Sequence, residues 1–262
     1  MPRFSAHVGY LFPDRPLLER FDAVAKAGFK AVDMPAPYEV PAAAIKDAVT
    51  RNGLTPLGLN TPRHFKDAPH SLAALPGREK DWDQAFDLAL EYATTIGNSG
   101  IHCMGGIVPD GQRAEAEMTF IANLKRSADI AAAKNVTLLI EPINPRDAPG
   151  YFLNRVDHAA DIIAKVGKPN VKIQFDFYHV QIVSGDLIKN LIKYFPLVGH
   201  LQCAAVPVRH EPDTDCEINY PFVFAEVDKL GYKGWIGAEY HPRGRTEDGL
   251  GWATPYGVVP KK

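Results

Sequence analysis

The sequence has few cysteines and no long run of apolar residues. Its 262 residues include three cysteines, and no two of them form a C-x-x-C pair. This argues against a disulfide framework and against a zinc–cysteine cluster. No apolar stretch approaches the roughly 18 residues that a membrane span needs, and the first residues lack the basic and apolar regions of a secretion signal. We therefore expect a cytoplasmic protein with no membrane partner.

Positive and negative charges are nearly balanced. Lys and Arg number 29 and Asp and Glu number 31, which leaves a formal net charge of -2. A protein that binds nucleic acid through a basic surface is therefore disfavoured. The sequence also lacks a phosphate-binding glycine loop, a G-x-S-x-G elbow and a Cys-His nucleophile signature, so nucleophilic catalysis is unsupported.

Strand-like and helix-like segments alternate along the whole chain. Eight segments are predicted as strands: 4–8, 31–34, 56–59, 100–104, 136–140, 171–175, 198–203 and 235–239. Glycine or asparagine, the residues that best end a helix, follows six predicted helices: Gly28, Gly53, Gly97, Asn135, Gly167 and Gly231. Eight units of about 33 residues predict an α/β fold, a (β/α)8 TIM barrel with a short final helix, as one domain over 1–262. A doubly wound open sheet is the alternative.

Four polar residues end consecutive predicted strands. They are Glu141 in VTLLIE, Asp176 in VKIQFD, Gln202 in GHLQC and Glu239 in WIGAE. In a parallel barrel such residues meet on one rim, where the active sites of these barrels lie. Three carboxylates gathered there repel one another and are costly to desolvate unless a cation compensates them. The all-oxygen set predicts a divalent metal, Mg²⁺ or Mn²⁺, as cofactor.

Four further residues are candidates for binding a substrate. His179 follows Asp176 by three residues, and Arg209 offers the guanidinium that suits a substrate carboxylate. His7 and His102 lie in the first and fourth predicted strands and can face the lumen. Each has a plain structural alternative, either a histidine held by hydrogen bonds in the core or an ion pair on a surface loop.

Several segments together resemble the hydroxypyruvate isomerases and 2-oxo-tetronate isomerases, within the xylose isomerase-like TIM barrels. The resemblance covers nearly the whole chain and is carried by LPGRE (75–79), IEPIN (140–144), IQFDFYHVQ (173–181), GHLQ (199–202), RHEP (209–212), EINY (217–220) and GWIGAEYHPRGRTEDGLGW (234–252). It implies that the four strand-end residues are the metal ligands and that Glu141 and Glu239 are the catalytic acid/base pair. The chemistry of these roles leaves Arg209 and His179 to hold the substrate carboxylate.

The resemblance predicts a reaction. A metal-dependent isomerase would move a carbonyl between adjacent carbons of a small hydroxy-keto acid through a cis-enediolate, from hydroxypyruvate to tartronate semialdehyde or from 2-oxo-tetronate to 3-oxo-tetronate. A metal that chelates both oxygens acts in such chemistry as Lewis acid and template. The sequence departs from the family pattern at His7, at His241, in EPDTDC and in RHFKDAPHS (63–71). His7 lies near the end of the first predicted strand and the others lie on rim loops, so the reaction class is better supported than the substrate.

Three alternatives remain open. A ketose 3-epimerase of the same superfamily uses a similar two-carboxylate metal site, with histidine more often in the place of Gln202. A metal-dependent phosphodiesterase resembling the apurinic-site endonucleases needs a histidine-rich multi-zinc rim and a basic surface. A non-catalytic barrel would keep its stability when metal is removed. Assembly into a homo-oligomer is also left open.

Overall fold

Parallel strands form a ring at the centre of the molecule. The computed structural model describes residues 1–65 and 68–261, so Lys66 and Asp67 of RHFKDAPHS lie outside the described residues. The strands of the ring are β1 (Arg3–His7), β2 (Ala31–Asp33), β3 (Thr55–Pro56), β4 (Gly58–Asn60), β7 (Gly100–His102), β8 (Thr137–Ile140), β9 (Val171–Asp176), β10 (Val198–Cys203) and β11 (Trp235–Ala238). They pair in the order β3-β2-β1-β11-β10-β9-β8-β7-β4, which confirms the predicted barrel.

The ring closes at Leu57, between β3 and β4. The Leu57 amide donates to the carbonyl of Val32 at 2.9 Å, and the Leu57 carbonyl accepts from the amide of Gly100 at 2.9 Å. One residue thus bonds to β2 on one side and to β7 on the other. The predicted strand 56–59 is divided at this residue, because β3 forms its ladder with β2 and β4 forms its ladder with β7. The Gly58 carbonyl of β4 still accepts from the Met34 amide, just after β2, at 2.9 Å. A short antiparallel pair, β5 (His64–Phe65) and β6 (Ala68–Pro69), follows and was not predicted.

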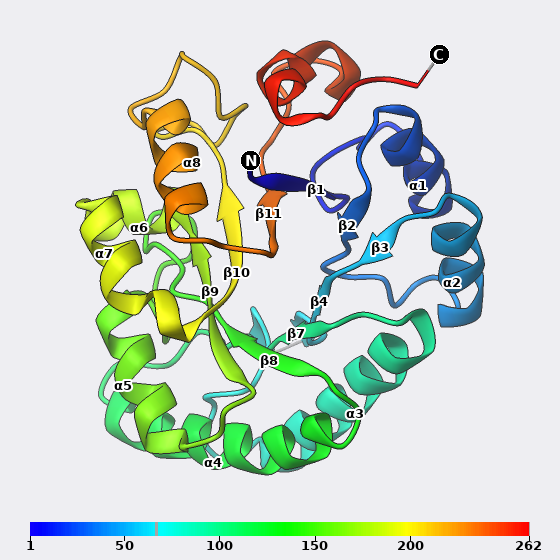
Figure 1. Ribbon diagram of the computed structural model, residues 1–262. Coiled ribbons are helices and arrows are strands. Elements are labelled where there is room, and N and C mark those ends of the chain that lie inside the picture. Colours follow the sequence, from blue (N-terminus) through cyan, green and yellow to red (C-terminus); the bar gives the residue numbers. More distant parts are fainter. Residues whose placement is uncertain (66–67, 262) are drawn as a thin grey trace.

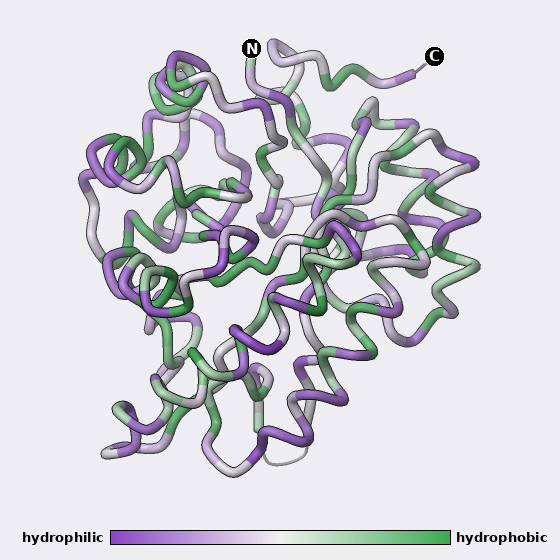
Figure 2. The backbone as a smooth tube through the Cα atoms, turned by 60° about the horizontal axis from the view of Figure 1, so that its bottom comes forward, coloured by the Kyte–Doolittle hydropathy of each residue, from purple (hydrophilic) through white to green (hydrophobic). Residues whose placement is uncertain are grey.

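Helices surround the ring on its outer side (Figure 1). They are α1 (Leu17–Lys26), α2 (Ala42–Arg51), α3 (Glu79–Ile96), α4 (Arg113–Ala132), α5 (Val156–Val166), α6 (Phe177–Val183), α7 (Leu187–Tyr194) and α8 (Tyr220–Lys229). Their apolar residues are buried against the strands, and Figure 2 shows hydrophilic and hydrophobic residues alternating along them. The six residues predicted to end helices all have positive φ, from 57° at Asn135 to 100° at Gly28, as predicted.

A 3₁₀ helix takes the place of the eighth α-helix. It is η2 (Thr246–Tyr256), and it lies beside β1 in Figure 1; a shorter one, η1 (Phe195–Leu197), precedes β10. Trp252 and Tyr256 pack on the ring of Phe4, with centroids 4.9 and 5.2 Å away. The expected short final helix is therefore present, but not as an α-helix, because its two glycines and Pro255 disfavour one. In the described part of the chain, no helix is both long and apolar enough to cross a membrane.

Candidate active site

The four strand-end residues come from neighbouring strands on one side of the ring. Glu141 directly follows β8, Asp176 ends β9, Gln202 lies in β10 and Glu239 directly follows β11. Asp176 and Gln202 are register partners, so they stand side by side at the same height. The side chain of Glu239 is 12% exposed, and the other three residues are buried more completely. The structure therefore gathers charge at the carboxyl ends of the strands, where barrel active sites lie.

Three of these residues carry a buried oxygen atom that makes no hydrogen bond to a described residue. These atoms are Glu141 Oε1, Gln202 Oε1 and Glu239 Oε2, of which Glu239 Oε2 lies 3.4 Å from Arg209 Nη2 in an ion pair. Asp176 uses Oδ1 to accept from the Tyr178 amide at 2.9 Å, which caps α6 and leaves Oδ2 for the site. A buried oxygen without a partner is costly, and hard divalent cations prefer oxygen ligands. These residues therefore fit a site for Mg²⁺ or Mn²⁺.

His179 lies close to the carboxylates but is oriented as a donor. One atom each of Glu141, Asp176 and His179 could meet at a metal, since these atoms lie within 4.8 Å of one another. However, His179 Nδ1 accepts from the Asn144 amide at 3.3 Å, so the neutral ring carries its proton on Nε2. Burial, followed by the charge of Arg209, holds the pKa of His179 well below its usual value. A protonated Nε2 suits a substrate oxygen better than a metal.

The two other histidines each contact one glutamate and are also neutral. His7 Nε2 lies 3.3 Å from Glu239 Oε1, and His102 Nδ1 lies 3.4 Å from Glu141 Oε2. Burial lowers the pKa of each imidazole to about 3, so neither compensates a carboxylate near neutral pH. Gln174 donates to Glu141 Oε2 at 3.0 Å and fixes that carboxylate.

The three carboxylates resist ionisation in the absence of a cation. Burial raises the pKa of Glu141 well above its usual value, and the charges of Glu239 and Asp176 raise it further. Burial also raises the pKa of Asp176 to about 7, although the nearby Arg209 opposes this effect. The pKa of Glu239 is raised by burial, again against the opposing charge of Arg209. A divalent cation would relieve this cost in all three groups.

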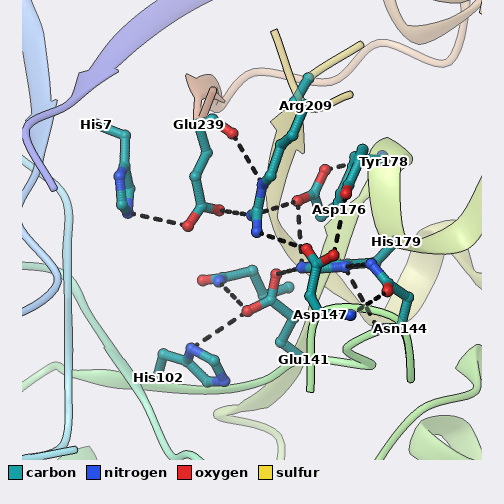
Figure 3. Close-up of polar contacts among 12 residues, drawn as sticks. His7, His102, Glu141, Asn144, Asp147, Asp176, Tyr178, His179, Arg209 and Glu239 are labelled. Atoms are coloured by element: carbon teal, nitrogen blue, oxygen red, sulfur yellow. Dashed lines mark hydrogen bonds and ion pairs between the residues drawn. The ribbon is translucent and has the colours of Figure 1, made fainter. Parts of the chain in front are cut away.

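The guanidinium of Arg209 lies among three carboxylates (Figure 3). Its Nη2 is 3.4 Å from both Asp176 Oδ2 and Glu239 Oε2, and its Nη1 is 3.2 Å from Asp147 Oδ2. The rings of Tyr10 and Tyr178 flank it, with centroids 5.1 and 4.8 Å from Cζ. The positive charge of Arg209 is therefore already compensated within the site. Its predicted role on the substrate carboxylate stays a prediction.

A cavity of about 490 Å³ opens at this end of the barrel. Its wall includes Glu141, Glu239, His102, His179 and Arg209. That volume lies in the range of small-molecule sites.

Sequence reasoning missed two residues of this site. Asn144, which orients His179, stands three residues after Glu141 in IEPIN, and that spacing could have placed it on the same rim. Arg63 also lines the cavity, from the loop after β4.

Comparison with known proteins agrees with this geometry. Residues 21–256 match the family model described as "Xylose isomerase-like TIM barrel". The chain belongs to this family. Over 98% of its length it is 49% identical to the 2-oxo-tetronate isomerase of Cupriavidus necator, covering 99% of that protein. Over the same share it is 37% identical to the hydroxypyruvate isomerase of Escherichia coli, covering 100% of that protein.

A solved structure is similar over the whole chain. It is described as AP endonuclease, family 2, from Brucella melitensis, and it is 40% identical with a TM-score of 0.94, covering 98% of this chain and 99% of that one. The family resemblance and the barrel are thus confirmed. Because the curated relatives match from end to end and are named isomerases, this family member is an isomerase.

Proposed function

We propose that this isomerase moves a carbonyl between adjacent carbons of a small hydroxy-keto acid through a cis-enediolate, with bound Mg²⁺ or Mn²⁺. The names of the relatives point to hydroxypyruvate and 2-oxo-tetronate as substrates. The observation that carries the proposal is the pair Glu141 and Glu239. Both line one cavity, each has a buried oxygen without a hydrogen-bond partner, and Figure 3 shows them reaching the site from two sides.

Four residues would hold the metal: Glu141, Asp176, Gln202 and Glu239. Bound there, a divalent cation would supply Lewis-acid stabilisation of the negative charge that develops on two adjacent substrate oxygens. We favour Gln202 over His179 as a ligand, because the Asn144 amide directs the proton of His179 to Nε2. A multi-zinc nuclease needs a basic surface and several metal-binding groups. The charge of this chain is balanced, and its described residues contain one group of His, Asp and Glu side chains with metal-binding spacing.

Glu141 and Glu239 would move the proton. One carboxylate removes the proton from the hydroxyl-bearing carbon, and the electron pair of that C–H bond forms the double bond of the enediolate. A proton then returns to the former carbonyl carbon, while the hydroxyl proton passes from the hydroxyl oxygen to the former carbonyl oxygen. The hydroxyl-bearing carbon thereby becomes the new carbonyl, and the former carbonyl carbon bears the new hydroxyl. Both carboxylates line the cavity, so each can reach a substrate bound there.

Neighbouring residues would hold the two glutamates and the substrate in place. Gln174 fixes Glu141, and His7 contacts Glu239, so His7 acts on the glutamate as a positioning residue. His102 and His179 line the cavity, and the Nε2 proton of His179 is available to a substrate oxygen. Their contact with the substrate remains part of the proposal.

The experiment compares metal-free and metal-loaded enzyme. Protein stripped with a chelator is mixed with hydroxypyruvate or 2-oxo-tetronate, with and without Mg²⁺ or Mn²⁺, and the product is followed by NMR. We expect conversion only with metal, and a loss of about 10²- to 10⁴-fold in kcat for Glu141→Gln and for Glu239→Gln. The exposed Glu91→Gln on α3 is the matched control and should retain full activity.

Two results would contradict the proposal. Equal rates with and without metal would remove the cofactor from the mechanism. Conversion of free ketoses, with neither acid converted, would instead identify a ketose 3-epimerase.

A further inference from the structure

Arg63 presents an unpaired charge to the cavity. It lies in the loop that follows β4, at the same end of the barrel as the glutamates, and it lines the cavity beside them. Its Nε is buried without a hydrogen-bond partner, and no ion pair joins it to another described residue. An unpaired buried donor is costly unless a ligand accepts from it.

The two other arginines of this region are already engaged. Arg209 is paired with three carboxylates, as described above. Arg146 is exposed, and its Nη1 donates to the carbonyl of Pro207 at 3.1 Å. Arg63 is therefore the arginine in the described cavity wall whose side chain has no partner of its own.

The net charge of the site also leaves Arg63 without a compensating negative charge when the proposed metal is bound. Four carboxylates, those of Glu141, Asp147, Asp176 and Glu239, carry four negative charges. Arg146, Arg209 and a divalent cation together offset them. The charge of Arg63 remains. Arg63 lines the same cavity as His102 and Glu239. A substrate with one negative charge would balance it.

We propose that Arg63 binds the substrate carboxylate and selects keto acids over neutral ketones of the same carbon skeleton. A guanidinium can donate two parallel hydrogen bonds to a carboxylate, which fixes the orientation of the acid as well as its charge. This inference rests on the proposed function. It gives Arg63 the contact that the sequence analysis predicts for Arg209.

The test uses two molecules that differ only at the recognised group. Hydroxypyruvate carries a carboxylate where dihydroxyacetone carries a hydroxymethyl group. In metal-loaded enzyme, Arg63→Gln should raise KM for hydroxypyruvate by about tenfold to a hundredfold, the loss expected for charge-assisted hydrogen bonds. Deuterium exchange into dihydroxyacetone should stay unchanged. Arg146→Gln removes the same charge from the same region and should leave KM for hydroxypyruvate unchanged.

A binding measurement separates this inference from the proposed function. D-glycerate has the carboxylate but no keto group, and glycerol has neither group. Neither probe can be isomerised, so calorimetry with them measures binding without turnover. Weaker D-glycerate binding in Arg63→Gln than in Arg146→Gln would support the carboxylate site even if the wild type converted neither keto acid. Equal D-glycerate affinity in both variants, or an equal loss of hydroxypyruvate and dihydroxyacetone reaction in Arg63→Gln, would overturn it.

Discussion

Gly237 makes room for one of the proposed metal ligands. It is the register partner of Gln202 on the neighbouring strand β10. A Cβ atom at Gly237 would lie 3.0 Å from Gln202 Cγ, 3.2 Å from His200 Nε2 and 3.3 Å from Asp33 Oδ2. All three groups are buried side chains of the lumen, so none can move away without disturbing another. The glycine therefore leaves the space that the side chain of Gln202 occupies.

Gly237→Ala should weaken metal binding by displacing Gln202. We expect about a tenfold to hundredfold loss of Mn²⁺ affinity by calorimetry, and a loss of about 1–3 kcal/mol in the free energy of unfolding from overpacking. Gly251→Ala is the matched control, because a Cβ there meets no atom within 4 Å. If Gly237→Ala bound Mn²⁺ as tightly as the control, Gln202 would not be a ligand.

The positions of some site residues can be predicted from the sequence, and those of others cannot. Glu141 and Asp176 each end an apolar strand segment, and parallel strands bring such ends together, so their proximity follows from pattern alone. Arg63 and Asn144 lie in loops, where no periodicity fixes the direction of a side chain. The pairing of Arg209 with three carboxylates depends on the approach of loops that are distant in sequence.

Among the elements, the helices and strands were predictable and their interruptions were not. The alternation of apolar strands and amphipathic helices, punctuated by residues such as Gly167, specifies the barrel. The division of the third strand at Leu57 depends on its two neighbours, which no local pattern records. The 3₁₀ form of η2 follows from its own glycines and Pro255, but its packing on Phe4 joins the two ends of the chain.

For the whole molecule, the metal site and the fold are thermodynamically linked. The proposed ligands come from strands between β8 and β11, so they meet only in the folded chain. A ligand that binds only the folded state stabilises it. Without metal, the buried carboxylates destabilise the folded state when they ionise, because burial disfavours their charged forms.

The stabilisation by metal should therefore grow with pH. Asp176 has its pKa raised from 3.8 to about 7, so its neutral form stabilises the metal-free protein below about pH 4. This contribution is lost as the pH rises through about 7. The Tm of the metal-free protein should fall from pH 5 to pH 8. Added Mn²⁺ should raise the Tm by more at pH 8 than at pH 5. In metal-free Asp176→Asn, the fall in Tm between pH 5 and pH 8 should be smaller than in the metal-free wild type. An equal fall in Tm would contradict the linkage.

The most direct test of the account follows hydrogen during one turnover in D₂O. Metal-loaded enzyme is mixed with an equal amount of hydroxypyruvate, and the tartronate semialdehyde formed is examined by NMR at its hydroxyl-bearing carbon. Proton transfer by Glu141 and Glu239 through an enediolate predicts deuterium from the solvent at that carbon. Either Gln variant should form product about 10²- to 10⁴-fold more slowly. Product formed without solvent deuterium would mean that the same hydrogen reaches the neighbouring carbon, either directly or through one shielded base. Either result would contradict the transfer of the proton by two glutamates.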